Sequence, residues 1–419
     1  MRLIEEEDVE FIRLQFTDVF GNLKNIAVTP GQMERVVTGL YPIEASALFD
    51  DKYEVGEDLF LCPDYDTFVI LPWRPQQRKV CKIICDICDR NGRPFYMSPR
   101  TILKNTVKEA AKLGYAFNVE PECEFFLFHT DDNGTPTTIT HESAGYLDVG
   151  PVDLGENVRR DMVLTLEEMG FEIQSSHHEM APAQHEIDFV GGEALQTADD
   201  IMTFKFAIRS IARRNGLHAT FMPKPRADMA GSGMHLKIAL LKNGKNVFAG
   251  KCEDKMTDEA EAFMGGIMEY AADMCAVTNP LVNSYKRILS GYQAPGRIDW
   301  CMRGEKTALK YSNFCGDAKV EIRFPDPSAN PYLAIAACIK AGLRGIEEKR
   351  KTGQPNDMAA DRLPQNLKDA LEQMKSGGFL QEVLGQEMSD IYYNLKLKEW
   401  NDYMIQVSDW EVAHYLTRM

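Results

Sequence analysis

The sequence predicts an α+β chain of about two domains. With 419 residues, the chain exceeds the size at which a single hydrophobic core keeps growing. The first ~95 residues carry short strand patterns separated by turn signals, which predicts a small β-rich domain. From Pro99 onward helix patterns alternate with strands, and the last ~60 residues are helical. We therefore expect domains at residues 1–96 and 97–419.

The expected elements rest on apolar spacing and on the residues that end each segment. In the first domain, turns at Gly21-Asn22 and Asn91-Gly92 separate the strand patterns. These patterns span residues 11–18, 24–30, 66–73 and 79–87. In the second domain, a helix through residues 103–114 ends at Gly114, because glycine readily adopts the backbone that follows a helix. Apolar spacings of three and four predict the C-terminal helices.

Composition excludes several classes of function. The formal net charge is −16 and there is no run of Lys and Arg, which argues against nucleic acid as a partner. The N-terminus is acidic without an apolar signal segment, and no apolar stretch reaches the ~18 residues of a membrane span. Ten scattered cysteines fit reduced thiols better than a disulfide framework. We expect a cytoplasmic protein.

Four strand-like segments carry metal-binding or anion-binding groups on one face and apolar groups on the other. Residues two positions apart share a face of a strand, so Glu122 and Glu124 in PECEFFLF point the same way. The other segments supply Glu179, Glu186, His235, Glu321 and Arg323. One such pair alone is more typical of an exposed surface. Five Glu and one His on four segments indicate faces that converge on a cation.

Divalent metal ions are the natural partners of these carboxylates. Like charges ~4 Å apart repel by ~4 kcal/mol per pair at an effective dielectric constant near ~20, so five carboxylates need neutralising. Oxygen-rich ligation with a single imidazole favours Mg²⁺ or Mn²⁺ over Zn²⁺, which draws more on His and Cys.

Eight segments resemble, in order and spacing, the signature blocks of class I glutamine synthetases, close to the short α-type of Gram-positive bacteria. They are EPECEFF, SHHEMAPAQHEIDF, HATFMPKP, GSGMH, NSYKR, GYQAP, EIRFPDP and ANPYL. The likeness covers nearly the whole chain. It implies a β-grasp domain at residues 1–96 and a catalytic domain at residues 97–419, in which antiparallel sheet and helices form a funnel-shaped site. It also implies a homo-dodecamer of two hexameric rings, with active sites between neighbouring subunits.

The resemblance implies an ATP-dependent ligase that joins glutamate to an amine through γ-glutamyl phosphate. Two metal ions and two arginines would neutralise the ATP phosphates while the γ-carboxylate attacks in line. The metal nearer glutamate would be held by Glu124, Glu179 and Glu186, and the metal nearer ATP by Glu122, His235 and Glu321. Arg287 and Arg323 match the arginines that hold the glutamate carboxylate and the transferred phosphate, and Gly231 matches a glycine whose backbone contacts glutamate.

The departures from the family pattern gather at the amine step. Glu44 stands where the family usually has the Asp that deprotonates ammonium, and Gln293 replaces the flap Glu of Gly-Tyr-Glu-Ala-Pro. Ala230 replaces an Asn that contacts glutamate. On the nucleotide side, the positions that differ are Gln174, Glu305, Lys310 and Lys319.

Three interpretations follow. The first is an active ligase for an organic amine, since an uncharged Gln293 weakens ammonium binding and removes a proton acceptor. The second is a true glutamine synthetase in which Glu44 and another group compensate. The third is a non-catalytic paralogue that acts as a scaffold or regulator. Retention of all six metal ligands favours catalysis.

Overall fold

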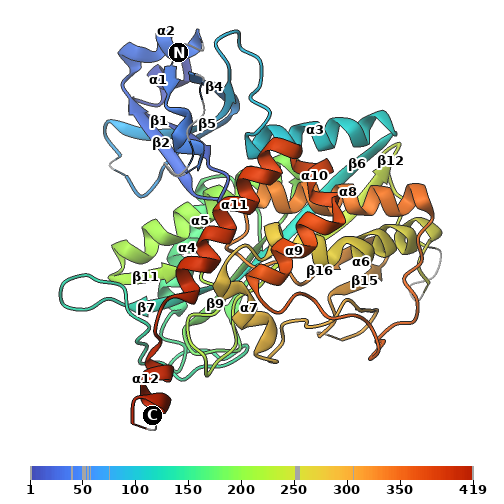
Figure 1. Cartoon of the computed structure of the whole chain (residues 1–419). Coiled ribbons are helices and arrows are strands. Elements are labelled where there is room, and N and C mark those ends of the chain that lie inside the picture. Colours follow the sequence, from blue (N-terminus) through green and yellow to red (C-terminus); the bar gives the residue numbers. More distant parts are fainter. Residues whose placement is uncertain are drawn as a thin grey trace.

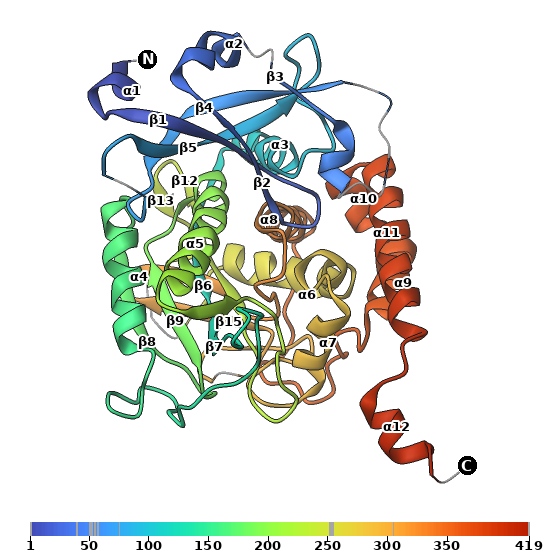
Figure 2. The same ribbon diagram turned by 90° about the vertical axis from the view of Figure 1, so that its left-hand side faces the viewer.

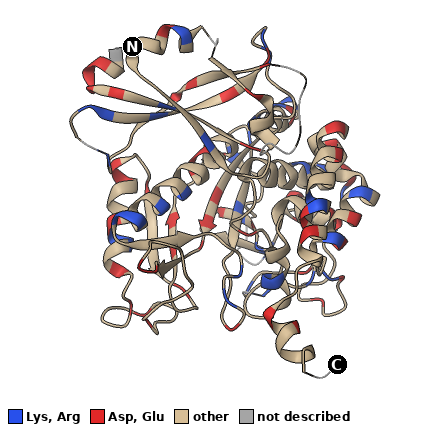
Figure 3. Ribbon diagram, turned by 60° about the vertical axis from the view of Figure 1, so that its left-hand side comes forward, with Lys and Arg blue, Asp and Glu red and all other residues tan. Residues whose placement is uncertain are grey.

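The computed structural model describes residues 2–38, 41–49, 53, 56, 58–74, 76–250, 255–304 and 306–417. A smaller N-terminal domain sits on one side of a larger body, and the last helix projects from the opposite side (Figure 1). Lys and Arg are interspersed with Asp and Glu over both parts in the view of Figure 3. Among the described residues, no helix combines the length and the apolar character that crossing a membrane requires.

The N-terminal domain is a five-stranded sheet with short helices. Its strand order is β2-β1-β5-β4-β3, with β1 and β5 parallel and the other pairs antiparallel. This arrangement is the expected β-grasp. The strands are β1 (Val9–Thr17), β2 (Leu23–Val28), β3 (Tyr41–Ile43), β4 (Leu59–Ile70) and β5 (Lys79–Cys88). The helical segments are α1 (Arg2–Glu6), η1 (Pro30–Gln32), α2 (Met33–Val37) and η2 (Ala45–Phe49).

The larger domain contains two sheets. One has the order β10-β6-β12-β16-β15-β14, with β13 beside β12, and the other has the order β11-β7-β9-β8. The first sheet is built from β6 (Tyr115–Cys123), β10 (Gly192–Glu193), β12 (Met234–Lys242), β13 (Lys245–Asn246), β14 (Trp300–Cys301), β15 (Leu309–Phe314) and β16 (Asp317–Ile322). The second is built from β7 (Phe125–His129), β8 (Ile173–His178), β9 (Gln184–Phe189) and β11 (Leu217–Thr220).

Helices cover these sheets and form the C-terminal part of the chain. In Figure 2, α4 and α5 lie on one side and the C-terminal helices on the other. The first group is α3 (Pro99–Lys112), α4 (Glu156–Glu168), α5 (Ala194–Arg214), α6 (Asp258–Thr278), α7 (Val282–Leu289) and α8 (Pro331–Glu348). The C-terminal group is α9 (Leu367–Gly377), α10 (Phe379–Leu384), α11 (Gln386–Met404) and α12 (Asp409–Tyr415).

Buried ion pairs join the two domains. Arg100 on α3 donates to Asp86 on β5 at 2.7 Å, to Asp64 on β4 at 2.8 Å and to Asp199 on α5 at 2.7 Å. One guanidinium thus holds carboxylates from both domains, and its planar fork suits several acceptors at once.

The structure confirms the α+β class and the helical C-terminal region. The expected helix at residues 103–114 begins earlier, at Pro99, because proline needs no hydrogen-bond acceptor in the first turn. It ends as expected before Gly114, whose φ is +81°. The strand expected at residues 66–73 ends at Ile70, before Pro72, which has no N–H to donate to a sheet. The division at residues 96 and 97 stays a prediction.

Candidate active site

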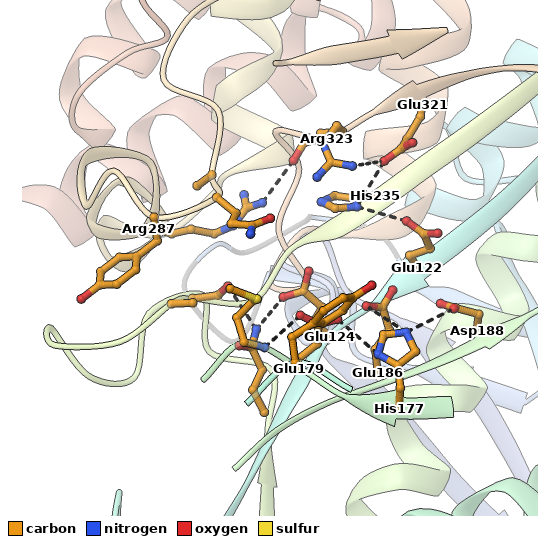
Figure 4. A pocket seen from close by; sticks show the side chains of 18 of the residues that line it. Glu122, Glu124, His177, Glu179, Glu186, Asp188, His235, Arg287, Glu321 and Arg323 are labelled. Carbon is orange, nitrogen blue, oxygen red and sulfur yellow. Dashed lines mark hydrogen bonds and ion pairs between the residues drawn. The ribbon is translucent and has the colours of Figure 1, made fainter. Parts of the chain in front are cut away.

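Strands from both sheets of the larger domain, with α7 and the loop after it, line a cavity of about 510 Å³ (Figure 4). Within the first sheet, His235 on β12 pairs with Glu122 on β6, and Lys310 on β15 pairs with Glu321 on β16. Directly paired residues on neighbouring strands project from the same face. All six groups that the sequence singled out as metal ligands line this cavity: Glu122, Glu124, Glu179, Glu186, His235 and Glu321.

The first of the two expected triads is closely gathered. Nδ1 of His235 lies 3.1 Å from Oε2 of Glu122 and 3.5 Å from Oε1 of Glu321. The potential ligand atoms of the three residues all lie within 4.8 Å of one another. Lys237, two positions beyond His235 on the same face, donates to Glu122. Burial by itself raises the pKa of Glu122, but His235 and Lys237 outweigh burial and hold that pKa well below its ordinary value.

The second expected triad is more crowded with negative charge. Glu124 accepts hydrogen bonds on Oε2 from Nε2 of Gln184 at 2.6 Å and from the backbone N–H of Gly233 at 3.0 Å. Burial, together with the charge of Glu179, raises the pKa of Glu124 to about 7. Burial and the charges of neighbouring carboxylates, Glu124 first, raise the pKa of Glu186 well above its ordinary value. These carboxylates lack sufficient positive charge nearby.

The two neighbouring histidines have different environments. His177 faces the cavity, where its Nε2 lies 4.0 Å from a carboxylate oxygen of Glu186 and 4.0 Å from one of Asp188. His178 is fully buried behind the strands, and its Nε2 lies 2.9 Å from Oε1 of Glu142. His177 is therefore available to a ligand in the cavity, whereas His178 is part of the packed interior.

The two arginines reach the cavity from different elements. Arg287 lies on α7 and is 3% exposed. Burial lowers its pKa, although the charges of Glu124 and Asp326 act in the opposite direction. Arg323 follows β16 directly and donates to Glu321. Both arginines line the cavity, and Arg323 lies beside Glu321 (Figure 4).

The donor set fits a pair of hard divalent cations. The cavity offers six carboxylates, counting Asp188, and two imidazoles, and two of the carboxyl pKa values are raised by burial and by other carboxylates. A divalent cation removes that repulsion, and oxygen donors suit Mg²⁺ or Mn²⁺. Glu122, His235 and Glu321 could hold one ion. The expected second set, Glu124, Glu179 and Glu186, lines the cavity without such close gathering, and the ligand atoms that lie within 4.8 Å of those of Glu186 are those of His177 and Asp188.

The mouth of the cavity is less polar than its floor. Gln293 and Tyr292 come from the exposed loop after α7, and Met180 from the turn between β8 and β9. Tyr146 contributes a further exposed ring, which packs edge-on against His177 at a centroid distance of 5.8 Å. Tyr146, Met180 and Tyr292 thus line the cavity together with the uncharged Gln293, and Asp228 and Lys306 line an adjoining hollow that Gln293 also borders.

Four further expected residues line the cavity and three do not. Gly231, Gln293, Lys310 and the neighbouring Ala230 all belong to the lining. Three others lie outside it: Gln174, Lys319 and Glu44. Gln174 is exposed on β8, and Lys319 is held by Glu120 and Asp317, each at 2.8 Å. Glu44 is exposed between β3 and η2 in the N-terminal domain. Glu305 lies outside the described residues.

Sequence reasoning missed several lining groups, among them two charged side chains and an exposed tyrosine. Asp188 follows Glu186 by two positions on β9, and Lys237 follows His235 by two on β12. The period-two rule that identified Glu186 and His235 was sufficient to find both. Tyr146 lies in a loop, where no periodicity marks it.

Comparison with known proteins agrees with this geometry. The β-grasp domain model of glutamine synthetase matches residues 8–90, and the catalytic domain model matches residues 96–415. The glutamine synthetase of Clostridium saccharobutylicum is 46% identical over 436 aligned residues, covering 100% of this chain and 98% of the relative. That of Methanosarcina mazei is 41% identical over 434, covering 100% and 97%.

A solved structure has the same fold along almost the entire chain. The structure titled "GmaS/ADP complex-Conformation 1" superposes with a TM-score of 0.90 at 30% identity, covering 99% of this chain and 98% of the other. The family models together match more than half of the sequence, and the relatives named glutamine synthetase align end to end. The chain therefore belongs to the glutamine synthetase family.

Proposed function

We propose that the chain is an ATP-dependent ligase that joins the γ-carboxylate of glutamate to a primary organic amine. One observation carries the proposal. A single cavity collects six metal-ligand groups and two arginines, while an uncharged Gln293 stands at its mouth among Tyr146, Met180 and Tyr292.

The proposed phosphoryl transfer from ATP to glutamate rests on the residues at the floor of the cavity. Two Mg²⁺ or Mn²⁺ ions, when bound by the two triads, supply the positive charge that neutralises the phosphates of ATP. Arg323, beside Glu321, is placed to hold the transferred phosphate, and Lys310 on the same sheet face adds a cation on the nucleotide side. An ADP complex of the similar GmaS structure supports nucleotide binding by this fold.

Glutamate binding rests on the side of the cavity formed by α7. Arg287 offers a guanidinium for the α-carboxylate, and the backbone of Gly231 lies beside it. A Cβ at position 231 would come within 2.2 Å of the carbonyl oxygen of Pro223 and 3.3 Å of Cγ of Arg287. Only glycine therefore lets the chain pass here. The charge of Glu124 favours the protonated form of Arg287, and Glu124 can receive the ammonium group of glutamate.

The proposed preference for an organic amine rests on the residues at the mouth of the cavity. Ammonium needs carboxylates for binding and deprotonation, and Gln293 supplies neither a charge nor a proton acceptor. The side chains of Met180, Tyr146 and Tyr292 instead offer surface to the carbon substituent of an organic amine. Water competes with the amine for the acyl phosphate, so the amine must reach the site before the acyl phosphate hydrolyses.

True glutamine synthetase activity is the second candidate. Relatives with that name share 41% to 46% identity with this chain over its whole length. Glu44 can then provide the missing carboxylate from a neighbouring subunit.

We also propose that the chain assembles as a homo-dodecamer of two hexameric rings in the cytoplasm. Glu44 is exposed and does not line the cavity of its own chain, which fits a role in the active site of a neighbouring subunit. All nine described cysteines are free, as expected in a reducing compartment. Mixing inactive Glu44→Ala and Arg323→Ala chains should restore part of the activity, since some sites then receive both residues. No recovery in mixed assemblies would contradict shared sites.

The proposed function is tested by phosphate release. ATP, Mg²⁺ and glutamate are supplied with ammonium, methylamine, ethanolamine or putrescine at equal concentrations. We expect an organic amine to give the highest kcat/KM. Normal turnover with millimolar ammonium alone would favour the second candidate. Mn²⁺ binding without turnover on any amine would favour a non-catalytic scaffold.

A further inference from the structure

A second cavity, of about 260 Å³, lies between the two domains. It is bounded by β1 and β2 of the N-terminal sheet and by α5 of the larger domain, which runs beneath them (Figures 1 and 2). Its lining is Arg13, Gln15, Asn22, Leu23, Asn25, Met202, Lys205, Phe206 and Arg209. The candidate active site shares none of these residues.

The charged groups of this cavity are all cations. Lys205 lies at its floor and is 5% exposed, Arg13 is half-buried, and Arg209 is exposed at the rim. Within the described part of the chain, no carboxylate forms an ion pair with any of the three, and none lines the cavity. Their contacts are to uncharged groups, and Cζ of Arg209 lies 5.0 Å from the ring centroid of Phe221. Nζ of Lys205 donates to the carbonyl oxygen of Ala329 at 3.4 Å, and Nη1 of Arg13 donates to Oδ1 of Asn25 at 3.3 Å.

Two other buried cations at the same domain boundary have carboxylates close by. Arg100 holds three aspartates, as described above. Lys82 donates to Oγ1 of Thr203 at 2.8 Å, and the charges of Asp199 and Asp200 favour its protonated form. Lys205 sits two positions after Thr203, and burial lowers its pKa to about 8, as it does for Lys82, while the charge of Asp326 acts in the opposite direction. Burial of an ammonium group is costly, and so is the mutual repulsion of three cations in one cavity.

The missing element is negative charge, in a protein whose overall charge is −16. We infer that this cavity is a binding site for a small dianion, a phosphate or a compact dicarboxylate. Lys205 would meet it at the floor, Arg13 and Arg209 at the rim, and the amides of Asn22 and Asn25 at the side. Arg13 belongs to one domain and Lys205 and Arg209 to the other, so a bound dianion links the two domains.

The link reaches the active site through α5. Phe204, next to Lys205, packs edge-on against Phe125 at a centroid distance of 6.3 Å, and Phe125 follows the metal-ligand candidate Glu124 directly. The cavity is therefore placed to act as an effector site, separate from the substrates.

The test is thermal unfolding of the full chain, freed of metal and nucleotide, titrated with inorganic phosphate or with succinate against NaCl of equal ionic strength. At least one dianion should raise Tm in a saturable manner, because a ligand of the folded state stabilises it by mass action. Arg209→Gln should raise the apparent Kd for the dianion at least ~10-fold, because a charge-assisted contact is lost. Arg213→Gln, exposed one turn later on α5 and outside the cavity, is the matched control and should bind normally.

A second variant distinguishes phosphate binding in this cavity from phosphate binding at the arginines of the active site. Lys205→Met removes the buried charge and should raise Tm without any anion while abolishing the saturable response. The inference is overturned if neither dianion gives a saturable rise in the wild-type chain, or if Arg209→Gln and Arg213→Gln respond equally. It is also overturned if Arg209→Gln changes only the oligomeric size, since a carboxylate of a second copy then fills the cavity.

Discussion

The guanidinium of Arg287 donates a hydrogen bond from Nη2 to the backbone carbonyl oxygen of Arg323, at 3.1 Å. Its Nη1 donates to the carbonyl oxygen of Phe324 at 2.9 Å. Helix α7 is therefore tied to the end of β16, so that the two arginines of the site are positioned as one unit. Gly233 makes this possible, because a Cβ there would lie 2.8 Å from Nη2 of Arg287.

Replacing Arg287 by Lys should impair glutamate use. An ammonium cannot make both carbonyl contacts and also bind a carboxylate in a bidentate way. We expect kcat/KM for glutamate to fall ~100-fold or more, a loss of ~3 kcal/mol. Steady-state kinetics at varied glutamate measures it. Arg297→Lys is the control, because Arg297 also donates to a carbonyl, that of Ala360 at 2.9 Å, but lies outside the cavity. Equal effects in both variants would refute the assignment.

Replacing Glu321 by Gln should weaken one metal site. The triad of Glu122, His235 and Glu321 then loses a charged ligand, and we expect ~10- to 100-fold weaker binding of one Mn²⁺ per chain. Titration with Mn²⁺ followed by electron paramagnetic resonance counts both sites. Glu120→Gln lies on the same sheet face, outside the cavity and bound by Lys319, and should keep both ions. Two unchanged sites in Glu321→Gln would rule out this triad.

Glu124→Gln should change the pH dependence of stability in the metal-free protein. The folded-state pKa of Glu124 is raised to about 7, so between its ordinary pKa and that value the folded chain binds more protons than the unfolded chain. The free energy of unfolding therefore falls as pH rises through this window, by up to ~3 kcal/mol. The variant lacks this loss and should have the higher Tm at pH 8, with the difference vanishing near pH 4.5. Thermal unfolding in a chelator checks it. A lower Tm for the variant at pH 8 would contradict the raised pKa.

Gln293→Glu should shift the amine preference. A carboxylate at the mouth attracts ammonium and accepts its proton, so KM for ammonium should fall ~10-fold or more. Turnover with the preferred organic amine should not improve. Gln174→Glu makes the same change on an exposed strand position outside the cavity and is the matched control. An unchanged KM for ammonium in Gln293→Glu would show that this residue does not select the amine.

Much of the fold and of the site could be predicted from the sequence, because strand periodicity and turn residues are local signals. Glu122, His235 and Glu321 follow from their strands, and the structure gathers them. Strand pairing is not local, so Lys237 as the partner of Glu122 and the cationic cavity of Lys205 and Arg13 emerged only from the structure. Glu44 was named from the resemblance, and the structure of a single chain places it as an exposed residue outside the cavity.

The central claim is that the chain activates glutamate with ATP and transfers it to an organic amine. The most direct measurement is mass spectrometry of the products of one reaction that contains ATP, Mg²⁺, glutamate, ¹⁵N-ammonium and equal concentrations of methylamine, ethanolamine and putrescine. We expect a γ-glutamyl amide of an organic amine as the main product. Labelled glutamine as the main product would contradict it.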